Sequence, residues 1–280
     1  MRMICGSYYW PKEDKLKPEG DDAHFICAQE QTIGVADGVG GWAKHGVDAG
    51  QYARELMCNS IMSVQNQTIV DPRRVLNEAY ADTKCEGSST ACIVTLRETG
   101  VLHFVNVGDS GLMVFRNYKL LYMSPREQRS FNCPYQLGNS RGSDNPRSAT
   151  EIEIRVFPGD IVVLGTDGLW DNMYPNEIEQ VVLGNMRESR VMKPQALACL
   201  LADLAWLRSL DKDRFSPYSK AAQEAGKNHP GGKKDDITVV VGHIMVTSPV
   251  CSCVEDFVDR PLEIIWDNTK PVERATSTPW

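Results

Sequence analysis

Short apolar runs separated by glycine, aspartate and asparagine turns dominate the first part of the chain and recur near its end. These runs predict strands at 24–29, 32–36, 90–96, 101–107, 112–116, 119–123, 151–156, 161–164 and 237–244. Charged and apolar residues alternate in 151–156, as in a half-exposed strand, whereas 161–164 is continuously apolar and reads as buried. Short strands at such close spacing favour antiparallel sheets over βαβ units.

Apolar residues at helical spacing predict helices at about 47–65, 71–84, 175–186 and 197–207. In the first of these, Leu56 and Met57 fall on the apolar face. Asp71 followed by Pro72 is a helix start, with the aspartate as cap and the proline in the first turn. Leucines from 197 to 207 form a stripe that is typical of a core-facing helix. Together the elements indicate an α+β fold.

Two polar segments, 124–150 and 208–234, break this pattern and predict long loops. Loops of this length in a compact domain are usually functional or mobile. From residue 247 the chain has mixed polarity with four prolines. We expect one catalytic domain over 1–246 and a C-terminal tail over 247–280 that is partly docked or disordered.

Aspartates stand at the ends of several apolar runs, each beside glycine or another aspartate. They are Asp37, Asp109, Asp167 and Asp235, and the pair Asp21-Asp22 lies near the start. A single Asp-Gly after a strand is most often a turn. Recurrence at strand ends instead predicts that the carboxylates converge, and such a cluster is costly without a hard divalent cation. Oxygen ligands without histidine or cysteine favour Mg²⁺ or Mn²⁺, so the pattern predicts a binuclear metal hydrolase.

Composition and charge bear on the class of partner and on the location of the protein. The chain has 280 residues, a net charge of -7 and a pI near 5.3. This acidity argues against a general binder of nucleic acid or of membrane surfaces. No apolar stretch is long enough to cross a bilayer, and the first residues resemble neither a secretory signal nor a transit peptide. We expect a cytoplasmic protein as the sequence stands, or a mitochondrial or plastid one if a transit peptide precedes it.

The nine cysteines show no Cys-x-x-Cys spacing that would suggest zinc. We interpret them as reduced and mostly buried thiols. Cys251 and Cys253 leave a redox or metal pair open as an alternative.

The aspartate motifs, taken in order, resemble those of the type-2C metal-dependent protein Ser/Thr phosphatases. The matching segments are Gly20-Asp-Asp-Ala-His, Val35-Ala-Asp-Gly-Val-Gly-Gly-Trp, Gly87-Ser-Ser-Thr-Ala, Asn106-Val-Gly-Asp-Ser-Gly, Thr166-Asp-Gly-Leu-Trp-Asp-Asn-Met and Asp235-Asp-Ile-Thr-Val. They cover about residues 5 to 246. Glu127-Gln-Arg-Ser-Phe-Asn-Cys-Pro-Tyr-Gln-Leu is similar to the branch found in mitochondria and plastids.

The resemblance implies a four-layer αββα sandwich of two antiparallel sheets flanked by helices, with metals at one end. It implies that Asp37 bridges two Mg²⁺ or Mn²⁺ ions, that the Gly38 carbonyl binds one of them, and that Asp167 and Asp235 bind the other. Hydroxide formed between the ions would attack phosphoserine or phosphothreonine directly, without a phosphoenzyme.

The same carry-over makes Asp21 and Asp22 the acidic pair that holds metal-bound waters. Asp109 and Asp171 match a third, weaker metal position. Two departures stand out. Val39 replaces a histidine proposed as the acid for the leaving group, and Lys17 falls where many members have a phosphate-binding arginine. Lysine attracts phosphate as a point charge but cannot form a bidentate fork.

We therefore expect a monomeric protein Ser/Thr phosphatase that acts on phosphoproteins. Two alternatives remain at this stage. One is a catalytically weak phosphoprotein-binding member of the same fold, and the other is a hydrolase of small phosphoesters. Arginines in 124–150, Arg126, Arg129, Arg141 and Arg147, are candidates to steer an acidic substrate, or are ordinary solvated loop charges.

Overall fold

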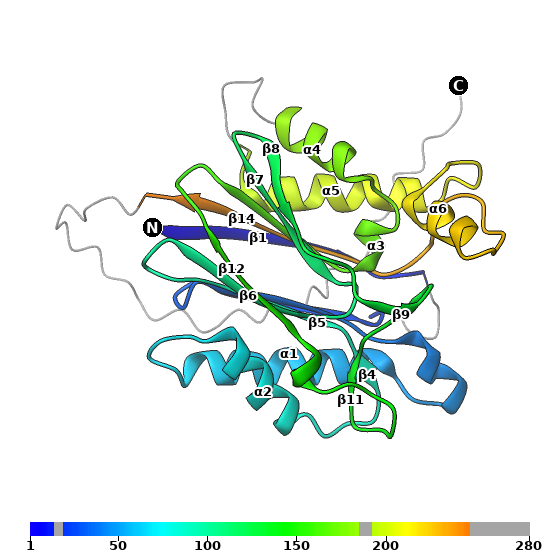
Figure 1. Ribbon diagram of the computed structural model, residues 1–280, viewed down its shortest axis with the longest axis horizontal. Helices are drawn as coiled ribbons and strands as arrows, with labels where there is room; N and C mark the ends of the chain where they lie inside the picture. Colours follow the sequence, from blue (N-terminus) through cyan, green and yellow to red (C-terminus); the bar gives the residue numbers. More distant parts are fainter. Residues whose placement is uncertain (14–18, 185–191, 247–280) are drawn as a thin grey trace, which may run out of the picture.

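Two antiparallel sheets packed face to face form the centre of the computed structural model, which describes residues 1–13, 19–184 and 192–246 (Figure 1). The first sheet has the order β1-β14-β13-β7-β8. Its strands are β1 (Arg2–Trp10), β7 (Gly111–Arg116), β8 (Lys119–Met123), β13 (Ile161–Gly165) and β14 (Ile237–Met245). The second has the order β12-β6-β5-β3-β2. Its strands are β2 (Asp22–Cys27), β3 (Thr32–Asp37), β5 (Ala91–Leu96), β6 (Val101–Val107) and β12 (Thr150–Arg155).

Helices cover the outer face of each sheet, which gives four layers (Figure 1). The second sheet carries α1 (Ala49–Gln65) and α2 (Pro72–Asp82). The first carries α3 (Asp167–Trp170), α4 (Pro175–Gly184) and α5 (Pro194–Ser209), with α6 (Pro217–Glu224) near one end. The αββα sandwich expected from the sequence is confirmed. No helix in the described ranges is both long and apolar enough to span a bilayer.

The core has three layers because each sheet buries both faces. Between the sheets lie Val35, Val94, Leu112 and Val240, each 0% or 1% exposed. One further layer packs beneath α1 and α2, and the other beneath α5. Strands buried on both faces read as continuous apolar runs, which explains why the sequence pattern located them so directly.

Helix starts follow the capping chemistry in the sequence. Asp71 accepts a hydrogen bond from the Arg73 amide at 3.0 Å, and Pro72 stands in the first turn. Asp48 caps α1 by accepting from the Gly50 amide at 3.1 Å. The helix therefore begins at Ala49 rather than at 47, after a 3-10 turn η1 (Gly40–His45) that the periodicity did not indicate.

The two segments expected to be irregular contain short elements. The first holds β9 (Gln128–Ser130), β10 (Cys133–Pro134), β11 (Leu137–Gly138) and η2 (Pro146–Ser148); β11 pairs with β4 (Ser88–Ser89). The second holds α6, which starts with a capping box between Ser216 and Ser219. The described cysteines are free thiols, as expected, but they are not mostly buried, since only Cys27 and Cys92 are buried and the others are half-buried. Cys251 and Cys253, with the tail over 247–280, lie outside the described residues.

Candidate metal centre

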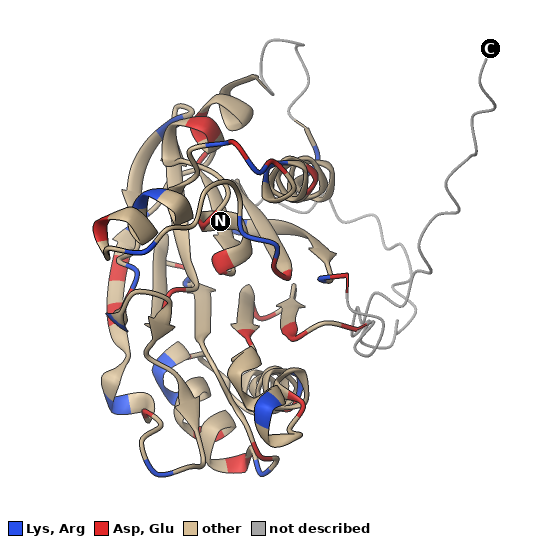
Figure 2. Ribbon diagram, turned by 90° about the vertical axis from the view of Figure 1, so that its right-hand side faces the viewer, with Lys and Arg blue, Asp and Glu red and all other residues tan. Residues whose placement is uncertain are grey.

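Strand polarity brings the predicted aspartates to one end of the sandwich. Strand β2 begins at Asp22, and its antiparallel neighbour β3 ends at Asp37. Asp109 lies in the turn from β6 to β7, Asp167 follows the end of β13, and Asp235 precedes the start of β14. Figure 2 shows acidic segments in red at strand ends near the middle of the view. Residues far apart in the chain therefore meet at one end of the sandwich, which we call the carboxylate end.

Three of these carboxylates are close enough to share a cation. One oxygen each from Asp37, Asp109 and Asp167 lies within 4.8 Å of the others. Burial, and then the charge of Asp167, raises the pKa of Asp37 well above its ordinary value. Burial also raises the pKa of Asp167 to about 7, although Lys233 opposes the rise. The protein thus holds carboxylates together at a cost that a bound cation would offset.

Asp22 is oriented by two threonines. Its Oδ2 accepts hydrogen bonds from Thr166 Oγ1 and Thr238 Oγ1, both at 2.8 Å. Its Oδ1 is buried and has no hydrogen-bond partner. Thr166 directly follows β13, and Thr238 is the second residue of β14. Nothing in the hydrophobic pattern of the sequence singled out either threonine. The arrangement fixes the carboxylate so that one oxygen is left for a ligand or water.

Asp21 and Gly38 lie beside this group. Asp21 Oδ1 accepts from the Gly50 amide at 3.2 Å, at the start of α1. The Gly38 amide donates to the Asp21 carbonyl at 3.0 Å. A Cβ at Gly38 would lie 2.5 Å from that carbonyl oxygen and 2.6 Å from the Ala49 carbonyl oxygen. Only glycine fits between these two backbones.

Lys233 is a cation that the sequence analysis missed. Its Nζ lies 2.9 Å from Asp171 Oδ2 and 2.9 Å from Asp235 Oδ2, and it also bonds to Asp167. Asn172 holds its backbone, accepting from the Lys233 amide at 2.9 Å and donating to its carbonyl at 2.8 Å. Burial alone would lower the pKa of Lys233, but the three carboxylates raise it well above its usual value.

Arg126 and Gln128 reach the other side of the cluster. Arg126 Nη2 lies 2.7 Å from Asp171 Oδ1 and 4.0 Å from Asp109 Oδ2. Gln128 Nε2 donates to Asp109 Oδ2 at 2.5 Å. Burial alone would raise the pKa of Asp171, but Arg126 and then Lys233 lower it. Asp109 and Asp171 therefore lie together, as expected, and each already has basic or amide partners.

Asp235 and Asp236 differ in their partners. Asp235 Oδ1 accepts from Lys12 Nζ at 3.4 Å and from the next amide at 3.2 Å. Asp236 Oδ1 accepts from Tyr9 Oη at 2.7 Å and from the Lys12 amide at 3.0 Å. Asp236 thus ties the start of β14 to the end of β1. Lys17, the expected phosphate-binding residue, lies outside the described residues.

Unpartnered oxygens test whether a cation fits. Asp22 Oδ1, Asp109 Oδ1 and Asp167 Oδ1 are all buried, and none has a hydrogen-bond partner in the part of the chain that the structure describes. Buried carboxylate oxygens are normally satisfied. Since oxygen-only donors suit hard divalent ions, the residues fit a Mg²⁺ or Mn²⁺ site.

Known proteins resemble this chain in sequence and fold. No protein-family model matches the chain. A curated phosphatase of Drosophila grimshawi, "Protein phosphatase PTC7 homolog fig", is 38% identical over 81% of this chain and 80% of its own length. The chain belongs to the type-2C protein phosphatase family. "Probable protein phosphatase 2C 55" of Arabidopsis thaliana is 49% identical over 87% of this chain.

A solved type-2C structure, the photosystem II phosphatase PBCP, superposes with a TM-score of 0.80 at 31% identity. It covers 86% of this chain and 98% of its own. The chain covers 52% and 59% of the two Arabidopsis relatives at the top of the comparison, so it spans little more than half of their length.

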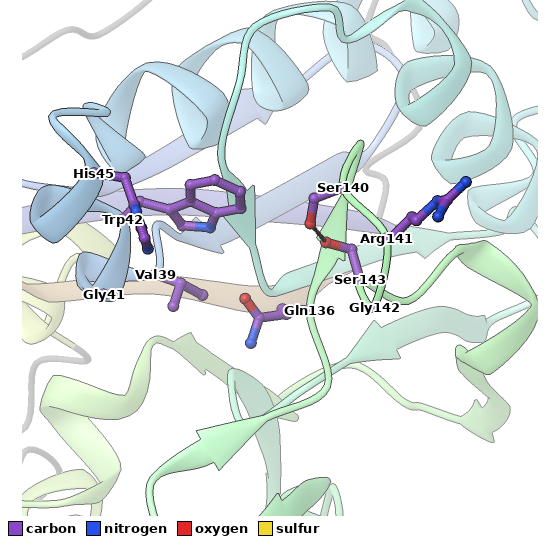
Figure 3. Close-up of a pocket in the computed structure, with 9 residues that line it drawn as sticks. All are labelled: Val39, Gly41, Trp42, His45, Gln136, Ser140, Arg141, Gly142 and Ser143. Atoms are coloured by element: carbon purple, nitrogen blue, oxygen red, sulfur yellow. Dashed lines mark hydrogen bonds between the residues drawn. The ribbon is translucent and has the colours of Figure 1, made fainter.

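A cavity of about 360 Å³ begins at Val39, the residue after Gly38 (Figure 3). One wall comes from the segment after Gly38 and the other from the residues on both sides of β11. The lining residues are Val39, Gly41, Trp42, His45, Gln136, Ser140, Arg141, Gly142 and Ser143. Trp42 Nε1 donates to Ser88 Oγ at 2.6 Å, and Ser88 Oγ donates to Gln136 Oε1 at 2.5 Å. This chain of hydrogen bonds fixes the two walls relative to each other.

Proposed function

We propose that the chain is a Mg²⁺- or Mn²⁺-dependent protein Ser/Thr phosphatase. The observation that carries the proposal is the group formed by Asp37, Asp109 and Asp167, whose oxygens lie within 4.8 Å of one another. Two of these residues, Asp109 and Asp167, have a buried oxygen without a partner. Membership of the family supports the same activity. The structure of PstP, described as a complex with two manganese ions, has the same fold with a TM-score of 0.60.

We assign Asp37 as the ligand shared by two ions, with the Gly38 carbonyl on one ion and Asp167 and Asp235 on the other. Cations bound there would activate water and offset negative charge on a phosphoryl group. Gly38 leaves room for the close backbone approach, since a Cβ would lie 2.5 Å from the Asp21 carbonyl oxygen.

With ions bound, Asp21 and Asp22 would orient the water beside them. The two threonine hydroxyls hold Asp22 Oδ2 at 2.8 Å, which fixes the carboxylate and leaves its buried Oδ1 without a partner among the described residues. The Gly50 amide at the first turn of α1 holds Asp21. Preorganised acceptors of this kind need no rearrangement during the reaction.

Phosphoprotein substrates suit the surroundings of the centre. The cavity of Figure 3 starts at Val39, directly after the proposed metal ligand Gly38, so it can take a residue that flanks phosphoserine or phosphothreonine. The Arg141 side chain is directed away from Val39 and Trp42 in Figure 3, so it offers an acidic peptide a positive charge at the rim of the cavity. We further propose a monomer, Lys17 as the phosphate-binding residue, and 1–246 as the catalytic domain.

The test is hydrolysis of a phosphopeptide and of p-nitrophenyl phosphate with Mn²⁺, by the wild type and by Asp37→Asn. Asp82→Asn, an exposed change of the same kind, is the matched control. We expect turnover that requires the metal and is lost only in Asp37→Asn. Absence of turnover in the wild type would instead support a binding protein, and preference for small metabolites over peptides would support a small-phosphoester hydrolase.

A further inference from the structure

Arg126 lies between the two aspartates that the family resemblance assigns to a third ion. Its Nη2 is 2.7 Å from Asp171 Oδ1 and 4.0 Å from Asp109 Oδ2. A guanidinium beside two carboxylates supplies positive charge and directed hydrogen bonds, which is what a third cation would supply there.

The remaining oxygens of the pair are largely taken as well. Asp171 Oδ2 bonds to Lys233 Nζ at 2.9 Å, so both oxygens of Asp171 have charged donors. Asp109 Oδ2 accepts from Gln128 Nε2 at 2.5 Å. Of the four oxygens of this pair, Asp109 Oδ1 alone has no partner among the described residues. One oxygen of Asp109 also lies in the group with Asp37 and Asp167. Asp171 therefore has no open oxygen for a third divalent ion. Asp235 differs, because its Oδ1 is held by the exposed Lys12 at 3.4 Å and by the next amide at 3.2 Å, whereas the donors to Asp171 are both largely buried.

The backbone holds Arg126 in this place. On one side of it, the Ser124 amide donates to the Leu112 carbonyl at 2.9 Å, and Ser124 Oγ accepts from the Leu112 amide at 2.9 Å. On the other side, the Glu127 amide donates to the Gly108 carbonyl at 3.0 Å. Both anchors belong to the ends of the turn that carries Asp109. The arginine is therefore fixed to the same turn as one of its carboxylate partners.

We propose that the Arg126 guanidinium takes the place of the third divalent ion in this chain, with Lys233 completing the charge around Asp171. The carboxylate end then holds two ions. This inference rests on the proposed function, because it concerns the same metal centre. It predicts that the segment 124–150 stays tied to the centre at any metal concentration, since its anchor is a side chain and not an exchangeable ion.

Counting bound Mn²⁺ tests the proposal. Electron paramagnetic resonance of free Mn²⁺, in a titration of the full chain to saturation, gives the number of bound ions per protein. We expect two for the wild type and an additional, weaker site in Arg126→Ala, because that change leaves Asp109 and Asp171 undercompensated. Arg126→Lys keeps the charge, so it should stay at two.

Arg129→Ala is the matched control, because Arg129 lies three residues away and pairs with Asp144 at 2.5 Å, outside the centre. It should bind two ions. Three ions in the wild type, or an unchanged count in Arg126→Ala, would overturn the proposal. A protein that binds no Mn²⁺ at all and hydrolyses no phosphopeptide would instead remove the proposed function itself.

A crystal of the wild type grown with Mn²⁺ provides a test that does not depend on folding of a variant. Anomalous scattering should show two peaks, with the Arg126 guanidinium still hydrogen-bonded to Asp171. A third peak between Asp109 and Asp171, with Arg126 displaced, would refute the inference while leaving the phosphatase assignment intact.

Discussion

Asp22 and Asp37 are register partners on the antiparallel strands β2 and β3. Like charges directly opposite each other destabilise a sheet. Burial is the largest cause that raises the pKa of each, and neighbouring carboxylates add to it. The sheet therefore carries a local electrostatic cost at the end where the other metal-centre aspartates converge. Because of this cost, folding stability should depend on whether the carboxylates are protonated and on whether a metal ion is bound.

Replacing Asp37 or Asp167 by asparagine should separate activity from stability. We expect phosphatase turnover with Mn²⁺ to fall on the order of 10³-fold or more in each variant, because a metal ligand is lost. In EDTA the same variants should melt at or above the wild-type temperature, since repulsion is relieved. Steady-state kinetics and calorimetry measure the two effects.

The control is Asp82→Asn, at an exposed helix end. It should change neither quantity. Near-wild-type turnover in Asp37→Asn or Asp167→Asn would exclude the assigned role of that residue.

The metal-free protein should lose stability as pH rises. The pKa of Asp167 is raised from 3.8 to about 7 in the folded state, so the folded protein binds more protons than the unfolded chain between these values. Relative to high pH, protonation of Asp167 adds to the free energy of unfolding. This added stability is complete below pH 4 and is lost as the pH rises through about 7. We expect an effect on the order of a few kcal/mol.

Melting in EDTA at pH 5 and pH 7.5, at constant ionic strength, measures this dependence. Other groups also titrate in this range, so the wild type is compared with Asp167→Asn. The melting temperature of the variant should depend less steeply on pH than that of the wild type. Parallel curves for the two proteins would show that Asp167 does not carry the effect.

Mn²⁺ should raise the melting temperature of the wild type, and EDTA should lower it. A ligand that binds only the folded state stabilises it by RT ln(1 + [L]/Kd), about 2.7 kcal/mol at a hundredfold excess over Kd. Differential scanning calorimetry over a Mn²⁺ series measures the shift. A melting temperature that is independent of Mn²⁺ would argue against an occupied centre.

Strand-end aspartates were predictable because turns and apolar runs are local signals. The partners of these residues were not. Lys233 reads as one residue of a solvated charge run, but bonds from Asn172 hold its backbone so that its ammonium meets the carboxylates. Arg126 likewise looked like one of several loop arginines. Which charge enters a cluster depends on long-range packing, and periodicity carries no information about that.

The same limit applies to β1, which the apolar pattern missed. Gly6 and Ser7 interrupt its run of apolar and aromatic residues. A Cβ at Gly6 would lie 2.2 Å from the Gln195 amide nitrogen, at the start of α5. The glycine permits the helix to lie close to the strand. This tertiary contact explains why a residue with low strand propensity stands inside β1. In contrast, α6 had a signal, Ser216-Pro217, within the segment expected to be a loop.

Arg141 should affect peptides more than small esters. It lies at the wall of the cavity beside the centre, whereas p-nitrophenyl phosphate offers nothing to fill that cavity. We expect Arg141→Ala to raise KM for an acidic phosphopeptide about threefold to tenfold, consistent with one charged contact of about 1 kcal/mol. Arg147→Ala, an exposed arginine of the same segment, is the control. Equal effects of both variants would point to general charge steering and not to the cavity.

Removing the ammonium of Lys233 should strengthen metal binding and weaken the metal-free fold. Lys233→Met leaves Asp171 and Asp235 without a donor that now lies 2.9 Å from each. The undercompensated carboxylates should bind Mn²⁺ at least about tenfold more tightly. In EDTA the loss of a partner from a buried ionic cluster should cost about 3 kcal/mol.

Lys234→Met, an exposed neighbour with the same change in charge, separates the local effect from net charge. Isothermal titration with Mn²⁺ and calorimetry in EDTA measure both quantities, and identical Mn²⁺ affinities for the two variants would mean that Lys233 does not share the cation-binding oxygens.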